Sequence, residues 1–306
     1  MINVYEQVDQ NKRRSTVIMV LFVVVFAFFV WVLTYLFSLF FFLSGYGLDV
    51  VGLALILASL MSFASYWWSD KIILAISKAR PADRERDFNF FTVTENLAMA
   101  AQIPNPQLYI IEDTAPNAFA TGRDPKHAVV CATTGLLKKL DRTELEGVIA
   151  HELSHVRNYD IRLMSLVTVL LGMITLLADW FLRGVRFKSR ERESGNFGGI
   201  LFLIGLVLIV LSPIIARLMK LAMARQREYL ADASAVMLTR QPDGLIRALE
   251  KISADKEPLE VANKATAHLY ITNPLKNRHD KIGWFANFFN THPPIEERIK
   301  ALKAMS

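Results

Sequence analysis

Long apolar segments alternate with amphiphilic ones along this chain. Residues 15–43 carry no charge, and a second apolar segment covers 50–68 after a short turn. A helix that spans a bilayer needs about 20 apolar residues, so both segments are long enough. The first is longer than the apolar region of a cleavable signal peptide, which favours an uncleaved anchor. Residues 163–182 and 197–219 are further candidates, for which core helices of a soluble domain are the alternative.

Basic residues predict the orientation of these segments. They occupy 12–14 before the first segment and recur within 71–86 after the second, whereas the loop 44–49 has none. Because basic residues favour the cytoplasmic side, both termini and both polar segments are expected there. The basic loop 183–192 would then lie outside. Either this loop is an exception, or the third and fourth segments re-enter without crossing.

The two polar segments are expected to form one domain, since a pair of membrane helices between them returns the chain to the same side. We therefore expect a multi-pass α-helical membrane protein with a mainly helical α+β domain that contains a small sheet. A tail at 1–14 and a transmembrane hairpin at 15–68 come first. The first part of the domain follows at 69–160, two further apolar segments at 161–219, and the second part of the domain at 220–306.

Local patterns predict the elements of the polar domain. Helices are predicted at 86–101, from Thr143 onward and at 217–238, and strands at 107–111, 117–121 and 128–132. The last two strands flank a Gly-Arg-Asp-Pro turn and should form a hairpin. Thr143 and Glu146 have the spacing of a capping box at the start of a helix.

Composition and charge limit the possible functions. The chain of 306 residues is 53% hydrophobic and has one Cys, which excludes a disordered chain, a collagen-like chain and a disulfide scaffold. Its net charge of +6 gathers at the predicted membrane edges, where anionic headgroups favour it. Because no phosphate-binding loop or nucleic-acid motif is present, we expect no nucleic-acid partner. Cys131 lies in an apolar strand and is expected to be inert core.

The sequence His-Glu-Leu-Ser-His at 151–155 carries the strongest chemical signal. Residues four apart share one face of a helix, so His151 and His155 can direct two imidazoles at one ion. Neutral imidazole suits Zn²⁺, and the carboxylate of Glu152 can polarise a water on that ion. Glu152 also falls within the apolar stripe of the helix, where a carboxylate is costly to bury without a metal or donor. The alternative is a chance pair of surface histidines.

A catalytic zinc needs a third protein ligand, and Glu228 and Asp232 are candidates. They are again four residues apart, so one carboxylate can bind the metal while the other orients a ligand histidine. Taken alone, an acidic pair at this spacing is more often a solvated helix face. The presence of the histidine pair upstream makes the metal-binding interpretation preferable.

These motifs resemble those of the HtpX-type membrane zinc metalloproteases, relatives of the CAAX prenyl proteases. Besides HELSH and the downstream EYLAD, the similarity includes NAFATG at 117–122, NYD at 158–160 and THPP at 291–294. The resemblance implies a zincin-like domain that binds one Zn²⁺ through His151, His155 and Glu228. It also implies Glu152 as general base and acid and Asp232 as the partner of a ligand histidine.

The resemblance further implies that His292 and Arg298 help to hold the substrate or stabilise the oxyanion. Without it, His292 would be a turn histidine in a proline-rich loop. An extended substrate could add to the strand formed by Asn117, Ala118, Phe119, Ala120 and Thr121, for which ordinary sheet core is the alternative. The histidines at 127, 268 and 279 are expected at the surface.

The expected function is a membrane-anchored zinc endopeptidase that cleaves membrane or membrane-proximal proteins. By resemblance it would act in protein quality control under stress, in a bacterial or archaeal cell membrane, with its site facing the cytoplasm and possible cooperation with other proteases. Intramembrane cleavage is disfavoured, because charged residues flank the HELSH motif closely. The remaining alternative is a membrane scaffold or carrier with structural zinc, which would more often have four protein ligands and use Cys.

Overall fold

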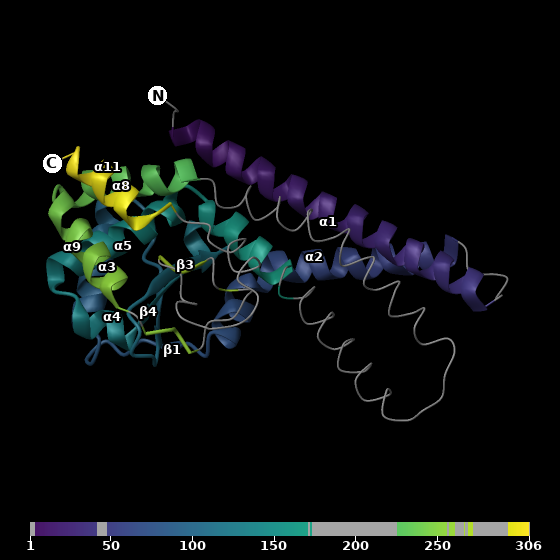
Figure 1. The fold of residues 1–306 in the computed structure, drawn as a ribbon, viewed down its shortest axis with the longest axis horizontal. Helices are drawn as coiled ribbons and strands as arrows, with labels where there is room; N and C mark the ends of the chain where they lie inside the picture. Colours follow the sequence, from purple (N-terminus) through teal and green to yellow (C-terminus); the bar gives the residue numbers. More distant parts are fainter. Residues whose placement is uncertain are drawn as a thin grey trace.

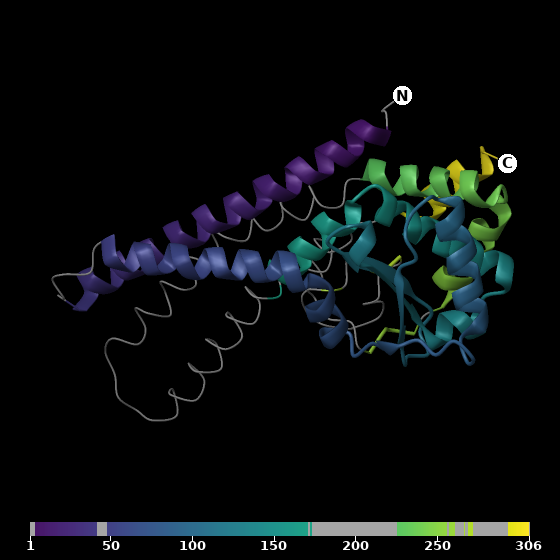
Figure 2. The same ribbon diagram turned by 180° about the vertical axis from the view of Figure 1, so that it is seen from behind.

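A computed structural model describes residues 4–41, 48–170, 172, 225–255, 257–260, 266, 269–271 and 293–305. Two long helices form an arm that projects from a compact body (Figures 1 and 2). Helix α1 (Val4–Phe41) begins beside the body and runs outward, and α2 (Leu48–Ile76) returns along it with a kink at Trp68.

The described helices include none that is both long enough and apolar enough to cross a membrane. Most of the third and fourth apolar segments, and the whole basic loop 183–192, lie outside the described residues. The predicted domain boundaries at 161–219 and the orientation of these segments therefore stay predictions.

The body contains a four-stranded sheet in the described part of the chain, with strand order β1-β2-β4-β3. Its strands are β1 (Arg80–Pro81), β2 (Gln107–Ile111), β3 (Ala118–Gly122) and β4 (Ala128–Thr133). Strands β3 and β4 are antiparallel, with Phe119 opposite Cys131, which confirms the predicted hairpin. Strand β2 runs parallel to β4. Strand β3 thus forms one edge of the sheet.

Helices surround the sheet on the side away from the arm (Figure 1). They are α3 (Phe88–Ala100), α4 (Thr134–Lys139), α5 (Arg142–Arg157), α8 (Arg225–Thr239), α9 (Pro242–Ala254) and α11 (Ile295–Lys303). Helix α5 is central, because it packs against α3, α8, α9 and β3. The mainly helical α+β body agrees with the fold class expected from the sequence.

The start of α5 corrects one prediction. The capping box is formed by Asp141 and Glu144, not by Thr143 and Glu146. The backbone N–H of Glu144 donates to Asp141 Oδ1 at 2.9 Å, and the N–H of Asp141 donates to Glu144 Oε2 at 2.9 Å. Asp is among the best N-cap residues, and Asp141 has the extended backbone that this position needs. The helix consequently begins earlier than predicted.

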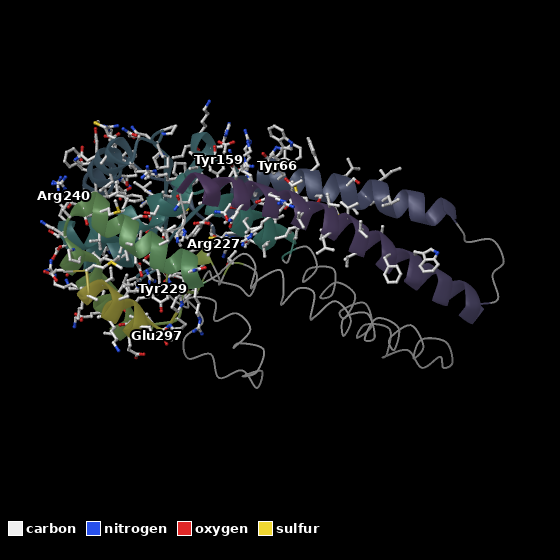
Figure 3. The ribbon with its side chains drawn as sticks, turned by 90° about the horizontal axis from the view of Figure 1, so that it is seen from above. Tyr66, Tyr159, Arg227, Tyr229, Arg240 and Glu297 are labelled. Atoms are coloured by element: carbon white, nitrogen blue, oxygen red, sulfur yellow. The ribbon has the colours of Figure 1, made fainter. Side chains whose placement is uncertain are left out.

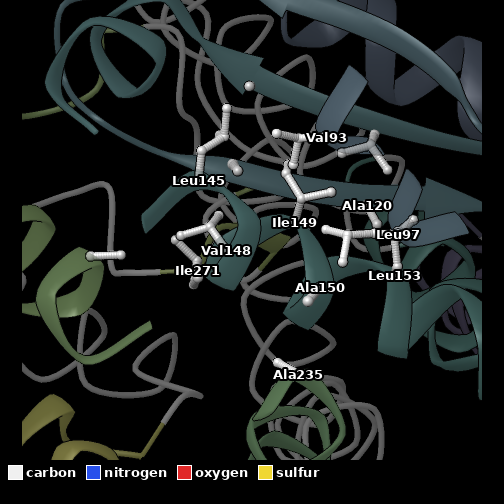
Figure 4. Close-up of a cluster of buried hydrophobic side chains, with 14 of the residues drawn as sticks. Val93, Leu97, Ala120, Leu145, Val148, Ile149, Ala150, Leu153, Ala235 and Ile271 are labelled. Carbon is white, nitrogen blue, oxygen red and sulfur yellow. The ribbon is translucent and has the colours of Figure 1, made fainter. Parts of the chain in front are cut away.

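Apolar packing fixes α5 between the sheet and the other helices (Figure 4). Its residues Leu145, Ile149 and Leu153 are buried in the same cluster as Val93 of α3 and Ala120 of β3. A second cluster, on the other side of the sheet, includes Cys131, Phe119 and Tyr270. Cys131 is fully buried, as expected for an inert core residue, and burial raises the pKa of its thiol well above the ordinary value.

Candidate metal centre

Three buried side chains from two helices converge on one point. His151 and His155 lie on α5, and their Nε2 atoms are 3.3 Å apart. Glu228, on α8, places Oε2 3.7 Å from His151 Nε2 and Oε1 3.6 Å from His155 Nε2. All three residues are at most 4% exposed. The predicted ligands are therefore brought together, although Glu228 is far from the histidines in sequence.

This arrangement fits a zinc ion. Ligand atoms about 2.0–2.1 Å from a tetrahedral zinc lie roughly 3.3–3.4 Å from one another, which matches the 3.3 Å between the two Nε2 atoms. With one oxygen of Glu228 added, the three ligand atoms lie within 4.8 Å of one another. Two imidazoles and one carboxylate are also the ligand set of known catalytic zinc sites, in which the fourth position stays open. The chemistry and the separations of the three side chains both suit the ion.

Asp232 contacts the ring nitrogen of His151 that faces away from Glu228, and Arg298 in turn bonds to Asp232. Asp232 Oδ1 lies 2.9 Å from His151 Nδ1. Arg298, on α11, donates from Nη2 to Asp232 Oδ1 at 2.6 Å and from Nε to Oδ2 at 2.9 Å. Burial opposes the charge of Asp232, but Arg298 outweighs it and lowers the pKa of the carboxyl to about 2. Asp232 thus stays ionised and accepts the Nδ1 proton, which leaves His151 Nε2 for the metal.

Asp160 holds His155 in the same way, and sequence reasoning did not assign it this role. Its Oδ2 lies 3.1 Å from His155 Nδ1. Burial disfavours a charged His155, but the hydrogen bond to Asp160 and the charge of Glu228 prevail and raise the pKa of the ring to about 9. The surroundings therefore favour positive charge at this point. The only sequence signal was the place of Asp160 in the NYD motif.

Arg298 is fully buried and contacts Asp232 and the candidate metal ligands, whereas its predicted contact with substrate or oxyanion is not tested by the structure. Its Nη2 is 3.4 Å from His151 Nδ1, and its Nη1 is 3.9 Å from Glu228 Oε2. Glu152 is buried on α5 beside His151. His292 lies outside the described residues, as do His268 and His279, whereas His127 is at the surface as expected, with Nδ1 2.7 Å from Asp124 Oδ1.

Four residues of the predicted substrate strand, 118–121, belong to β3 and Asn117 directly precedes it; all five are buried. The outer edge of β3 is already bonded near both ends. The N–H of Ile271 donates to the carbonyl of Ala118 at 3.1 Å, and the N–H of Gly122 donates to Ser165 Oγ at 3.1 Å. The strand packs on α5, the helix that carries the histidines. This places the edge of the sheet next to the candidate metal centre.

A helix that presents His-Glu-x-x-His beside a glutamate from a second helix defines a zincin-type metallopeptidase site. Comparison with known proteins agrees: residues 85–306 match the model of Peptidase family M48, and the chain belongs to this family. The protein is thus a metalloprotease, and its resemblance to the HtpX type is confirmed.

Several relatives cover almost the whole chain. A "Protease HtpX homolog" of Dictyoglomus thermophilum is 44% identical over 301 residues, covering 98% of this chain and 94% of the relative. Another, of Thermoanaerobacter pseudethanolicus, is 45% identical over 306 residues, covering 99% and 98%. Among solved structures, the crystal structure of S. mikatae Ste24p aligns with a TM-score of 0.48 at 21% identity, covering 81% of this chain and 57% of that one.

Proposed function

We propose that this metalloprotease is a zinc-dependent endopeptidase, anchored in a membrane, that cleaves membrane or membrane-proximal proteins in quality control. The observation that carries the zinc assignment is the convergence of His151, His155 and Glu228, which offer one ligand atom each within 4.8 Å of one another. The name of the relatives, "Protease HtpX homolog", supports the proteolytic role.

Each residue of the centre has a distinct task in the proposed reaction. When bound, Zn²⁺ would supply a Lewis acid for the scissile carbonyl and lower the pKa of water to about 7. Glu152 accepts the proton of the attacking water and returns it to the leaving amine. Asp232 and Asp160 keep the two imidazoles in the tautomer and orientation that binding requires.

Arg298 supports the centre from the interior. Its two hydrogen bonds to Asp232 fix that carboxylate, and its positive charge lies behind the ligands. The proposed contact of Arg298 and His292 with substrate or oxyanion stays a prediction from the family resemblance. In this proposal Arg298 acts on His151 through Asp232.

The proposed substrate is an extended polypeptide that pairs with the outer edge of β3. Strand addition uses backbone hydrogen bonds, so it recognises peptides of many sequences, as a quality-control protease requires. Because Ile271 already bonds to Ala118, we propose that the substrate backbone pairs near Ala120.

The arm is the proposed membrane anchor, and both its sequence and its exposed residues support this proposal. Residues 15–43 are uncharged, and the basic residues 12–14 precede them. Trp67 and Trp68, where α2 nears the body, are 42% and 47% exposed. Tryptophan is enriched at membrane–water interfaces, so this position fits the cytoplasmic edge of a bilayer. We propose the four spans and the cytoplasmic site on this basis.

The test compares full-length wild type with Glu152→Gln in detergent. Wild type should contain one zinc per chain and cleave casein. Chelation should remove the zinc and abolish cleavage, and adding zinc back should restore the bound zinc and the cleavage. Glu152→Gln should keep its zinc and lose cleavage, because the metal ligands are intact but the proton acceptor is gone. Equal cleavage by the two proteins would defeat the proposal, and a zinc-loaded wild type without cleavage would favour a scaffold.

A further inference from the structure

The first turns of α1 reach the body next to the metal centre. Asn11, on α1, is only 3% exposed. Its Nδ2 donates to the carbonyl of Asn158 at 2.8 Å and to Asp160 Oδ1 at 2.7 Å. Both acceptors belong to the segment that follows the histidine helix. A polar side chain from the start of the arm is therefore buried within the support of the site.

Asp160 connects Asn11 to a metal ligand. One carboxylate oxygen, Oδ1, accepts from Asn11, and the other, Oδ2, faces His155 Nδ1 at 3.1 Å. A carboxylate held at only one oxygen can turn about its last bond, whereas bonds at both oxygens fix its plane. Asn11 thus sets the direction in which Asp160 meets the imidazole. Arg227 also approaches Oδ1, but at the longer distance of 3.4 Å.

Cation–aromatic contacts dock α1 and α2 at the same place. Lys12 Nζ lies 4.6 Å from the ring centroid of Tyr159, and Arg162 lies 5.1 Å from that ring. Arg162 is also 5.5 Å from the ring of Tyr66 on α2. Tyr159 and Tyr66 lie close together where the arm joins the body (Figure 3). These contacts hold Asn11 against Asp160 and make the junction a defined interface.

We propose that Asn11 is a positioning residue of the metal centre, which acts through Asp160 on His155 and so couples the docking of the N-terminal helix to metal binding. The inference rests on the proposed zinc site. It assigns a role at the site to a residue of the arm, outside the segment 85–306 that matches the family model. The arm is then an anchor and also a part of the scaffold that shapes the centre.

The test is a double-mutant cycle on the full chain. Asn11→Leu removes both hydrogen bonds at similar side-chain volume, Asp160→Ala removes the link, and a third variant combines them. Partners of metal ligands typically change metal affinity by about 10–100-fold. We expect Asn11→Leu to weaken zinc binding at least about tenfold in a chelator competition, but by less than about twofold when Asp160 is already Ala.

The visible spectrum of the Co²⁺-substituted protein supplies a readout that global stability does not move. Asn11→Leu and Asp160→Ala should shift the ligand-field bands in the same way. Ser15→Ala is the matched control: Ser15 is buried on the same helix, but its hydroxyl donates to the carbonyl of Asn11 within α1. This control should keep the wild-type affinity and spectrum. If Asn11→Leu does not fold, Asn11→Ala replaces it, because it removes the amide donor without adding bulk or charge beside Asp160.

Two results would overturn the inference: an Asn11 variant with wild-type affinity and spectrum, or effects of Asn11 and Asp160 that simply add. Failure of the proposed function looks different. A wild type that binds no zinc, or binds it without needing His151, contradicts the metal centre itself. A wild type that binds zinc but cleaves nothing contradicts the protease and leaves the role of Asn11 intact.

Discussion

The two metal-facing imidazoles are fixed by different partners. His151 meets Asp232 at 2.9 Å, and His155 meets Asp160 at 3.1 Å. Each carboxylate accepts the Nδ1 proton, so each ring is left with Nε2 for the metal. The carboxylates themselves are held by different groups, since Asp232 is paired with the fully buried Arg298. The tautomers at the centre are therefore decided by residues that are not among the proposed metal ligands.

Replacing Arg298 with Leu tests this arrangement. It would leave the carboxylate of Asp232 buried beside that of Glu228 without its cation. Removing one partner of a buried pair usually costs about 3–5 kcal/mol, and we expect a loss of that size in the free energy of unfolding of the metal-free protein. Chemical denaturation measures it. Arg298→Lys keeps the charge but not the bidentate contact, so its free energy of unfolding should lie between those of wild type and Arg298→Leu. An Arg298→Leu variant as stable as wild type would contradict the prediction.

Cys131 offers a reporter of the intact body. Burial first, and the charge of Glu152 second, raise the pKa of its thiol well above the ordinary value, so little reactive thiolate forms in the folded protein. We expect no labelling by iodoacetamide at pH 8 under native conditions and full labelling in denaturant. Intact-mass spectrometry distinguishes the two, and rapid labelling of the native protein would show that the strand is accessible.

At the level of elements, the sequence predicted what depends on local spacing. His151 and His155 share a helix face, and so do Glu228 and Asp232, which allowed these candidate ligands to be proposed from the sequence. Asp160 could not be found in this way because it lies beyond the end of α5. There Tyr159 has a φ of 60°, which turns the chain back so that Asp160 faces His155. Helical periodicity says nothing about such a turn.

Long-range contacts and competing caps account for the other differences. Asn11 and Asp160 are 149 residues apart, so no local pattern connects them. At the start of α5, the sequence analysis placed the capping box at Thr143 and Glu146, but the structure forms it with Asp141 and Glu144. A contact from a distant helix favours this earlier cap: Glu144 is 1% exposed and receives a hydrogen bond from Lys251 Nζ of α9 at 2.7 Å.

The packing of α5 against α9 depends on a glycine. A Cβ at Gly147 would lie 2.7 Å from the backbone N and 2.8 Å from the Cα of Leu245. Backbone atoms cannot move aside as a flexible side chain can, so Gly147→Ala must push the two helices apart. Overpacking of this kind costs about 1–3 kcal/mol. The gain in helix propensity of about 1 kcal/mol offsets part of this cost, so we expect a net decrease of up to about 2 kcal/mol in the free energy of unfolding, measured by denaturation.

Glu146→Ala is the matched control on the same helix. The side chain of Glu146 is one-third exposed and lies 3.1 Å from Arg142, one turn earlier. Exposed pairs of this spacing contribute about 0.3–0.5 kcal/mol, so its replacement should change stability little. A Gly147→Ala variant that matches this control would show that α9 can shift at no cost.

For the whole molecule, the metal centre joins parts that are distant in sequence. The proposed ligands come from α5 and α8, while Arg298 of α11 bonds to Asp232 and Asn11 of α1 bonds to Asp160. The candidate metal centre thus lies where the helices of the body meet the start of the arm. An ion that binds only the folded chain stabilises it by RT ln(1 + [Zn²⁺]/Kd), or about 4 kcal/mol at a thousandfold excess over Kd.

Metal removal should therefore loosen one region more than the others. We expect chelation to lower the melting temperature of full-length Glu152→Gln, chosen because it cannot cleave itself. Hydrogen exchange should increase in the second half of α5, in α8, in α11 and in the first turns of α1, while β2 and β4 stay protected by their own ladder. His155→Ala, which lacks a ligand, should melt at the same temperature with and without chelator. Faster exchange confined to the sheet would place the ion elsewhere, and unchanged exchange in α1 would separate the arm from the centre.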